Sequence, residues 1–463
     1  MPVNSFDNYP MNWKPVLHDR RPPIYTRLAR QLADDIRTGV LKPGDKMPPQ
    51  RELADFLDLH LSTITRVYKL CEEQGLICAK VGQGTFVSSD VNISGTLVCE
   101  HSDRDYIQMG TIMPPYNGNE LVVDFIKSVL TQPDIQTFLE YRSPAGTDVQ
   151  RRTISNWLQR VGVSAGPENI LFATGSQNAT CAAVLGLFKT GDRIGITPLS
   201  FAGLKGIAKM IGVQLVPLPV LPGSGDKLKL ESLKQFCRTE NIKGLYLIPD
   251  QNNPTTHSLT DEERRAVADA ANELGLIILE DAINRMCSED AAAPIYAYAP
   301  KQTIYIFSTS KFLSAGLRVA FMAVPPEYRE ALGSALYNIN LMVSPLNLEI
   351  VNRIFNTDLV DKLVDAKKQE LRERNELVNE ALRGYDVEGA LTCQFRWLHL
   401  PDKWTGKDFE EAADKAGVQV FCAERFTIGQ TAAPKAVRIC ISAPKNKEEL
   451  LTGLTRLKNI LEQ

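Results

Sequence analysis

Tyr305-Ile306-Phe307-Ser308-Thr309-Ser310-Lys311, with Gly316-Leu317-Arg318 shortly after it, is the stretch that decides the fold of the larger part of the chain. Residues 303–307 form a short apolar run, which is typical of a buried strand. The turn that follows presents hydroxyl groups and one lysine, and an arginine lies seven residues further on. This pattern predicts a buried strand that is followed at once by a hydroxyl-rich turn carrying Lys311.

Similar runs recur along the chain. Short apolar strands are expected at 170–173, 193–197, 244–248 and 275–280, and helical periods such as 261–274 lie between some of them. This alternation predicts an α/β domain with a largely parallel sheet. From about residue 360 the pattern changes to a charged helix, two strands and a closing helix, which predicts a smaller α+β domain. The corresponding ranges are 361–383, 393–400, 436–441 and a helix from 447 onward.

The first ninety residues form a separate unit. Apolar residues at 24, 28, 32 and 36 predict a helix that ends at Gly39, and two further helices are expected at 51–57 and 62–74, with Ser62 as the N-cap of the last. Strands at 76–80 and 85–88 surround a glycine turn. We therefore expect three helices and a wing at 20–88, a polar linker at 89–104, and the α/β unit at 105–463.

Composition narrows the class of protein. The 463 residues exceed one ordinary domain, 44% are apolar, 23% are charged, and the net charge is −3. The apolar runs are far shorter than the ~20 residues of a membrane span, so a cytoplasmic protein without a membrane partner is expected. Nine cysteines without a C-x-x-C pair and five dispersed histidines argue against a disulfide framework or a metal site.

Several motifs of the N-terminal unit resemble the winged helix-turn-helix of GntR-type repressors. They are Pro23-Ile24-Tyr25, residues 39–48, Gln50-Arg51-Glu52-Leu53-Ala54 and residues 82–87. The resemblance implies binding to double-stranded operator DNA, with the third helix in the major groove. The residues expected to face DNA are Arg51, Ser62, Thr63, Arg66, Gly82 and Gly84. One departure is His60-Leu61, where the family commonly has Ser or Thr followed by Arg. The alternative is a protein-interaction module, because residues 20–88 hold only 11 basic residues against 8 acidic ones.

A lysine can condense with an aldehyde, while hydroxyl groups and a guanidinium suit a phosphate, so the turn at 308–318 fits pyridoxal 5′-phosphate (PLP) held as a Schiff base. A surface lysine in a serine-rich turn is the alternative. Residues 106–460 resemble the fold-type-I aminotransferases in the order of their motifs. That resemblance implies cofactor contacts from Tyr141, Gly175, Ser176, Gln177, Phe201, Asn253, Asp281, Ser308, Ser310, Lys311 and Arg318, and a carboxylate contact from Arg438.

The resemblance also assigns roles. Tyr141 would reach the cofactor phosphate of a neighbouring subunit, which implies a head-to-tail homodimer. Residues 174–179 would bind phosphate at a helix N-terminus, and Phe201 would stack on the pyridine ring. Asn253 would donate to the phenolic oxygen and Asp281 would pair with the ring nitrogen. The family usually has a tyrosine two or three residues after that aspartate, whereas this chain has Ile283 and Asn284.

A GntR winged helix fused to an aminotransferase-like domain is the architecture of the MocR subfamily of bacterial regulators, which this chain resembles over nearly its whole length. The resemblance implies a regulator that senses an amino acid, a related amine or PLP itself through an aldimine at Lys311. A working aminotransferase with an attached DNA-binding domain is the alternative, although the missing tyrosine argues against efficient turnover. A scaffold without cofactor is a third hypothesis, disfavoured because Lys311, Asp281, Asn253 and Arg318 are all present.

Overall fold

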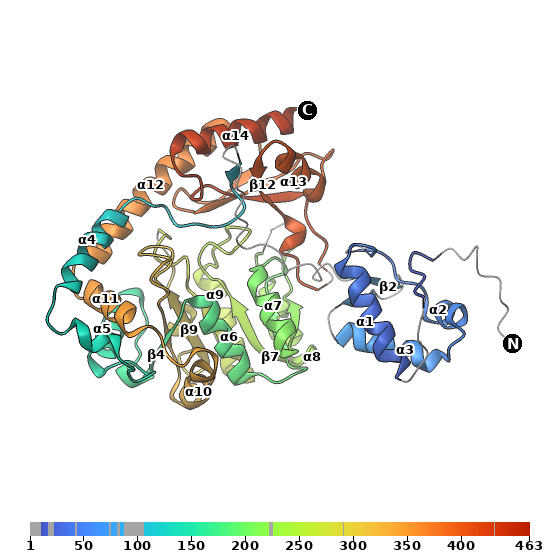
Figure 1. Cartoon of the computed structure of the whole chain (residues 1–463), viewed down its shortest axis with the longest axis horizontal. Coiled ribbons are helices and arrows are strands. Elements are labelled where there is room, and N and C mark those ends of the chain that lie inside the picture. The colour runs from blue at the N-terminus through green and yellow to red at the C-terminus, as the bar shows by residue number, and fades with distance from the viewer. Residues whose placement is uncertain are drawn as a thin grey trace.

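The computed structural model describes residues 11–16, 23–41, 44–73, 76–80, 84–87, 106–221, 226–289, 291–429 and 431–463. The predicted linker at 89–104 and Gly82 lie outside these residues. The part that is described contains an N-terminal unit of three helices and a hairpin, a larger α/β unit and a smaller α+β domain, as the sequence predicts (Figure 1).

The winged-helix unit has three helices followed by a two-stranded antiparallel hairpin. Its elements are α1 (Ile24–Arg37), α2 (Gln50–Leu57), α3 (Leu61–Glu73), β1 (Ile77–Lys80) and β2 (Gly84–Val87). Leu28, Leu32 and Ile36 of α1 are fully buried against α2 and α3, as their spacing predicts. Trp13 joins this core, and its Nε1 donates to Asp35 Oδ2 at 2.8 Å. The packed unit therefore includes residues upstream of the predicted boundary at residue 20.

The start of α3 differs from the prediction. The helix begins at Leu61, so Ser62 lies inside its first turn and is not the N-cap. His60 serves this purpose, because its Nδ1 accepts the backbone N–H of Ser62 at 3.3 Å and its carbonyl accepts that of Thr63 at 2.8 Å. A ring nitrogen supplies the acceptor that an N-cap Ser or Thr would otherwise give, which explains how the chain tolerates histidine here.

The larger unit is built on a seven-stranded sheet with the order β4-β10-β9-β8-β7-β5-β6. The strands are β4 (Ile170–Ala173), β5 (Arg193–Ile196), β6 (Gln214–Pro217), β7 (Ile242–Leu247), β8 (Ile277–Asp281), β9 (Thr303–Ser308) and β10 (Ala320–Ala323). The sheet is parallel except for β10, which runs antiparallel to both its neighbours. The prediction of a largely parallel sheet is confirmed, while β6 and β10 had no counterpart among the expected strands.

Alternate residues of β9 separate two cores. Tyr305 and Phe307 pack on one face of the sheet, and Ile304 and Ile306 pack on the other. Because both faces of the strand are covered, its sequence is continuously apolar. The surrounding helices are α4 (Asn119–Leu130), α5 (Asp148–Leu158), α6 (Ser176–Leu187), α7 (Ala202–Ile211), α8 (Leu230–Thr239), α9 (Asp261–Leu274), α10 (Arg329–Asn340) and α11 (Pro345–Phe355).

The smaller domain follows the long helix α12 (Leu359–Ala381), which runs beside α4 in Figure 1. A four-stranded sheet, β11-β12-β15-β14, packs with two further helices. These elements are β11 (Val387–Glu388), β12 (Phe395–His399), β14 (Phe421–Cys422), β15 (Ala436–Cys440), α13 (Gly406–Lys415) and α14 (Lys447–Glu462). A short strand at the start of the unit, β3 (Ile107–Gln108), pairs in parallel with β13 (Val418–Gln419). Residues far upstream thus complete the small domain.

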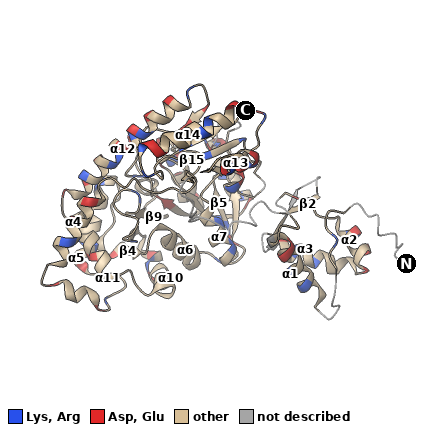
Figure 2. Cartoon of the chain, turned by 45° about the horizontal axis from the view of Figure 1, so that its top comes forward, with Lys and Arg blue, Asp and Glu red and all other residues tan. Residues whose placement is uncertain are grey.

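Charged residues of both signs are interspersed along the outer helices, for example along α12 (Figure 2). Ion pairs between exposed residues four apart, such as Lys362 with Asp358 and Arg265 with Asp261, account for part of this pattern. Among the residues that the structure describes, no helix combines the length and apolarity needed to span a membrane.

Candidate functional site

Lys311 lies in the turn directly after β9, at the carboxyl end of the parallel strands. Its Nζ donates to the backbone carbonyl of Ile112 at 2.7 Å. Burial of the ammonium lowers the pKa of Lys311 to about 8, and the positive charges of Arg438 and Arg318 act in the same direction. A substantial fraction of the side chain is therefore the neutral amine near pH 8, the form that attacks an aldehyde.

Gly175 and Arg318 face each other at the N-terminus of α6. Gly175 is the N-cap with a φ of 93°, and a Cβ at this position would meet Arg318 Nη2 at 2.2 Å. Arg318 donates to the Thr174 carbonyl at 3.2 Å and to Ser310 Oγ at 3.3 Å. The backbone φ of Arg318 is 54°, a value that is rare for residues other than glycine, so the surrounding contacts must hold the residue in this conformation. The structure thus brings a guanidinium, hydroxyl groups and a helix N-terminus together, a set suited to a phosphate.

Four other predicted residues lie at the end of β9 and at the starts of α6 and α7. Ser308 Oγ accepts the backbone N–H of Ser310 at 3.3 Å, which shapes the loop before Lys311. Gln177 Nε2 donates to the Gly203 carbonyl at 3.3 Å, and the Phe201 ring lies within 2.4 Å of where a Cβ on Gly203 would be. Ser176 is the first residue of α6, whose first N–H groups have no partner within the helix.

Asp281 ends β8 and is buried. Tyr246 of β7 donates its hydroxyl to Asp281 Oδ2 at 2.8 Å, and the Ile283 N–H donates to Oδ1 at 3.2 Å. Burial raises the pKa of Asp281 to about 6, although these two hydrogen bonds and the positive charge of Lys311 lower it. A nearby cation would stabilise the ionised form of this buried carboxylate. A protonated ring nitrogen would supply that cation.

Asn253 and Arg438, 185 residues apart in sequence, meet in the buried interior. Arg438 Nη1 donates to Asn253 Oδ1 and Nη2 donates to the Gly110 carbonyl. The guanidinium lies 4.8 Å from the centre of the Phe426 ring, and its Nε has no hydrogen-bond partner among the described residues. Burial lowers the pKa of Arg438. Since a buried guanidinium prefers a planar anion, this group could hold a carboxylate.

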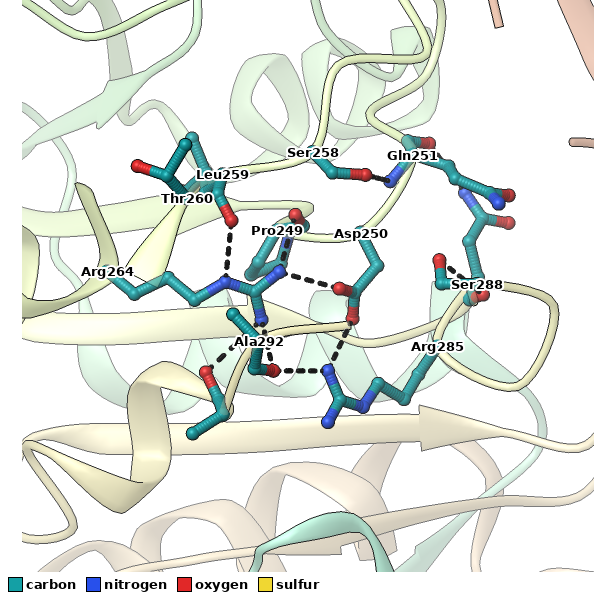
Figure 3. A network of polar contacts seen from close by, with 12 residues as sticks. Pro249, Asp250, Gln251, Ser258, Leu259, Thr260, Arg264, Arg285, Ser288 and Ala292 are labelled. Atoms are coloured by element: carbon teal, nitrogen blue, oxygen red, sulfur yellow. Dashed lines mark hydrogen bonds and ion pairs between the residues drawn. The ribbon is translucent and has the colours of Figure 1, made fainter. Parts of the chain in front are cut away.

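A buried ionic network supports the turn that carries Asn253 (Figure 3). Asp250 accepts from Arg264 Nη2 at 2.6 Å and pairs with Arg285 Nη1 at 3.5 Å. Both arginines also donate to the carbonyl of Ala292, at 3.2 Å and 2.6 Å. The network ties α9 and the segment after β7 to the loop after β8. The same ion pairs and hydrogen bonds therefore hold both the segment that carries Asn253 and the loop that follows Asp281.

The position of the missing tyrosine also has a structural explanation. Asn284 is buried, and its Nδ2 donates to the carbonyl of Gln251 at 2.9 Å. Ile283 packs against the apolar core around β8. Neither residue offers a hydroxyl group, so the departure from the family pattern replaces a cofactor ligand by a bond between two loops.

Asp226 is a residue of this site that the sequence motifs did not indicate. Its Oδ2 accepts from Asn252 Nδ2 at 2.6 Å and from the Thr255 hydroxyl, on either side of Asn253. Burial raises the pKa of Asp226 to about 6. No local pattern could have marked it, because its partners lie 26 and 29 residues away.

Tyr141 is not brought to the other predicted cofactor residues within the chain. Its side chain is 83% exposed. Several large apolar side chains of the preceding elements are exposed as well, among them Leu121, Val123, Leu130 and Leu139. Single exposed apolar residues are ordinary, but several along one stretch mark an interaction surface.

The predicted DNA-facing residues lie on the exposed sides of α2 and α3. Arg51, Ser62 and Arg66 are exposed, and Thr63 is half-buried. Arg66 lies over the Tyr25 ring at 5.8 Å, and Thr65, which was not predicted, bonds Gln50 of α2 at 2.9 Å. Gly84 has a φ of 113°, and a Cβ there would lie 3.0 Å from Lys46 Cε. Lys46 thus joins the wing, a contact without a local sequence signal.

Comparison with known proteins decides the family. Residues 24–87 match the family of bacterial regulatory proteins of the gntR type, and residues 104–457 match aminotransferase class I and II. An HTH-type transcriptional regulator of Bacillus subtilis strain 168, YdeF, is 42% identical over 462 residues, which cover 100% of this chain and 99% of the relative. The chain belongs to the MocR subfamily of GntR-type transcriptional regulators.

More distant similarities agree with this MocR assignment. The Escherichia coli K12 regulator YjiR is 25% identical over 341 residues, 68% of this chain and 72% of the relative. LysN, an α-aminoadipate aminotransferase of Thermus thermophilus complexed with N-(5′-phosphopyridoxyl)-L-leucine, superposes with a TM-score of 0.70. It shares 21% identity and covers 81% of this chain and 96% of its own, which shows a common fold.

The residues of the MocR chain fit PLP. A side chain at position 175 would collide with the Arg318 guanidinium, so glycine at this position leaves the cation its place beside the start of α6. Asp281 is buried at the end of β8, where its carboxylate accepts hydrogen bonds from the Tyr246 hydroxyl and the Ile283 N–H. When bound, PLP supplies an aldehyde for amines and a ring that withdraws electrons. Among the described residues, no cluster of three His, Cys, Asp or Glu could hold a metal ion.

Proposed function

We propose that this chain is a PLP-dependent transcriptional regulator that binds operator DNA and senses an amino acid, a related amine or PLP itself. One observation carries the proposal. Lys311 lies in the turn directly after β9, the buried Asp281 ends the neighbouring strand β8, and Arg318 lies against Gly175 at the start of α6, in a chain that also carries a GntR-type winged helix. Acting on the bacterial chromosome would place the protein in the cytoplasm.

Each residue has a role in this proposal. Lys311 joins the cofactor as a Schiff base, and Asp281 keeps the ring nitrogen protonated. Arg318, Ser308, Ser310 and the α6 N-terminus with Gly175, Ser176 and Gln177 hold the phosphate. Phe201 stacks on the ring and Asn253 donates to its phenolic oxygen. Arg438 grips the carboxylate of an amino acid effector, if the effector has one.

The regulatory step follows from linkage. An amine effector that took the place of Lys311 at the cofactor would close the small domain over the site, and this closure would bias the linker and the orientation of the two winged helices. Because binding free energies are reciprocal, DNA then changes the affinity for the effector by the same factor. Arg51, Ser62, Thr63, Arg66, Gly82 and Gly84 face the DNA.

We place the protein in a head-to-tail homodimer. The exposed side chain of Tyr141 supports this arrangement, as do the exposed apolar side chains of α4 and of Leu139. In the dimer Tyr141 reaches the phosphate of the partner's cofactor. Light scattering of the purified protein tests this, with a Tyr141→Phe variant that should remain dimeric and bind PLP more weakly.

The first experiment is the visible absorption spectrum of the purified protein with PLP, before and after a panel of amino acids. A Schiff-base band should form in the wild type and in a Lys301→Ala control, whose lysine is exposed, and should be absent in Lys311→Ala. A band that still forms with Lys311→Ala would contradict the assignment of Lys311 as the lysine that binds PLP. The complete absence of a band in the wild type favours a scaffold without cofactor.

A catalytic aminotransferase is the second candidate. The observation that favours it is the lowered pKa of Lys311, since a neutral amine can move the α-proton of a substrate as a general base. The loop of Ile283 and Asn284, which offers no hydroxyl group, argues against fast turnover. If an amino acid removes the band by converting the cofactor to its pyridoxamine form and a keto acid restores the band, the protein is an aminotransferase and not a sensor.

A further inference from the structure

The loop that carries Tyr141 is tied to helix α11 on both sides. We define this tyrosine loop as residues 134–147, which include the short 3₁₀ helix η1 (Ile135–Leu139) and end at the N-cap of α5. Helix α11 lies beside α5 in Figure 1 and also packs against η1. Two side chains one turn apart on α11, Glu349 and Arg353, reach the loop from there.

Arg353 binds the upstream side of the tyrosine loop. Its Nη2 donates to Asp134 Oδ2 at 2.5 Å, and its guanidinium carbon lies 5.9 Å from the centre of the Phe138 ring. The guanidinium of Arg142, the residue after Tyr141, lies 5.4 Å from the same ring centre. A cation over an aromatic face is attracted by the negative charge of that face. Phe138 therefore links Arg353 to the neighbour of Tyr141.

Glu349 holds the downstream side of the loop. Its Oε2 accepts from Gln150 Nε2 at 2.9 Å, and the Gln150 side chain accepts the N–H of Thr147 at 2.9 Å in the capping box of α5. The other carboxylate oxygen of Glu349 accepts from Arg353 Nε at 2.7 Å. Because a guanidinium is a rigid planar fork, a buried partner on Nε fixes the direction of its terminal nitrogens. The same pair of side chains thus holds both sides of the loop.

This arrangement differs from an ordinary surface ion pair. Isolated exposed pairs contribute little, because two flexible side chains lose freedom in forming them. Here Arg353 binds two carboxylates, one of which is buried. Other anchors of the loop are Ile135, which packs on the core, and Gly146, whose carbonyl accepts from an arginine of α5 at 2.9 Å. Both lie near the ends of the loop, whereas the contact on Phe138 extends to the residue beside Tyr141.

We infer that Arg353 is a positioning residue: it sets the direction in which Tyr141 projects, and it thereby completes the cofactor site of the partner subunit. The inference rests on the proposed function, in which Tyr141 reaches the phosphate of the partner's cofactor. A loosely held loop would have to be ordered at each binding event, and a loop that is already fixed avoids this cost. Arg353 does not touch the cofactor in this scheme. Its loss affects the site of the other chain and not the site of its own.

Titration of the full-length protein with PLP, followed by the Schiff-base band, tests this role. Arg353→Met and Asp134→Ala should each weaken PLP binding by about tenfold, the lower range for one hydrogen bond to a charged group. Asp134→Ala keeps the buried pair of Arg353 with Glu349, so it leaves the packing of α11 intact. Asp361→Ala is the matched control, because Asp361 forms an exposed ion pair with Arg160 outside the loop. Wild-type affinity in both folded variants overturns the inference.

A double-mutant cycle shows whether Arg353 acts through Tyr141. On a Tyr141→Phe background, Arg353→Met should cause no further loss of PLP affinity, because the contact that Arg353 positions is already gone. A merely structural role of Arg353 would weaken PLP binding by the same factor on both backgrounds. Additive losses therefore overturn the inference.

Mixed dimers, made by co-expressing two differently tagged chains, show which site the loop serves. In one mixture a Lys311→Ala chain is paired with an Arg353→Met chain. The remaining Schiff-base site then lies in the Arg353→Met chain and receives an intact tyrosine loop, so wild-type affinity is expected. In the other mixture both substitutions lie in one chain opposite a wild-type partner, and the loss of affinity should return. The reverse pattern overturns the inference.

The outcomes also separate this inference from the proposed function. If Tyr141→Phe binds PLP as tightly as the wild type, the proposed contact across the dimer is wrong and the inference falls with it. If Tyr141→Phe weakens binding but Arg353→Met and Asp134→Ala do not, the proposed contact stands and the inference alone is overturned. Light scattering and circular dichroism should show each variant dimeric and folded. Where Arg353→Met fails that check, Asp134→Ala decides the outcome.

Discussion

The Arg318 guanidinium occupies the space that a side chain at Gly175 would need: a Cβ on Gly175 would lie 2.2 Å from Arg318 Nη2. The two residues come from different strand ends, and their close approach places a cation at the N-terminus of α6. The positive φ of Gly175 adds a second reason for glycine.

Gly175→Ala should therefore weaken PLP binding. The methyl group displaces Arg318 and strains the backbone, and losing one charge-assisted hydrogen bond corresponds to about 1.5–3 kcal/mol, or roughly 10- to 100-fold in affinity. Equilibrium titration with PLP measures the change. Gly206→Ala in α7 is the control, because a Cβ there meets nothing within 4 Å. Equal affinities of the two variants would contradict a phosphate site at Arg318.

Asp281→Asn should reduce PLP affinity by a similar amount, about 10- to 100-fold, because the amide cannot pair with a protonated ring nitrogen. The shape of the residue is retained, so a thermal unfolding curve should show a folded protein. Tyr246→Phe removes the hydroxyl that bonds Asp281 Oδ2 and should have a smaller effect. A larger effect for Tyr246→Phe than for Asp281→Asn would contradict the assigned pairing.

The pKa of Lys311, lowered by burial to about 8, predicts the pH dependence of condensation with PLP. Only the neutral amine attacks the aldehyde, so the rate should rise by about tenfold per pH unit below pH 8 and level off above it. Stopped-flow absorbance from pH 6 to 10 measures this profile. A rate that keeps rising to pH 10 would show an ordinary, solvated lysine.

The same shift predicts a stability effect. Between the folded pKa of about 8 and the ordinary value of 10.5, the unfolded state binds more protons at Lys311, so the contribution of this lysine to stability rises with pH through that window. Lys311→Met removes the cost of burying the ammonium. The variant should unfold at a higher temperature than the wild type at pH 7, and the difference should shrink toward pH 10.5. A constant difference across this range would argue against burial as the cause.

Arg66→Ala should weaken binding to a duplex of mixed sequence and lower the salt slope by about one, as expected for the loss of one phosphate contact. Fluorescence anisotropy at several salt concentrations measures both quantities. Arg329→Ala changes an exposed arginine of the larger unit and should leave the slope unchanged. PLP content should be the same in both variants.

Much of the architecture was predictable from local pattern. The spacing of Leu28, Leu32 and Ile36 defines α1, and the apolar run before Ser308 defines β9, because neighbouring residues decide which face of an element is buried. The prediction of Ser62 as the N-cap of α3 was wrong, because a ring nitrogen of His60 takes the place of the expected hydroxyl acceptor. The edge strand β6 was missed because its four residues include Gln214 and Pro217, and β10 was missed because a run of four apolar residues is too short to distinguish a strand from a buried helix segment.

The sequence by itself determined the two units, the order of Asn253, Asp281, Lys311 and Arg318, and the residue types needed for an aldehyde cofactor. These features depend on residue identity and short-range spacing. Only the tertiary structure decided that Arg438 meets Asn253, that Asn284 bonds a loop, and that Ile112 binds Lys311 across 199 residues. Such contacts depend on strand order and on the folding back of the chain, and backbone carbonyls carry no residue type by which a sequence could mark them.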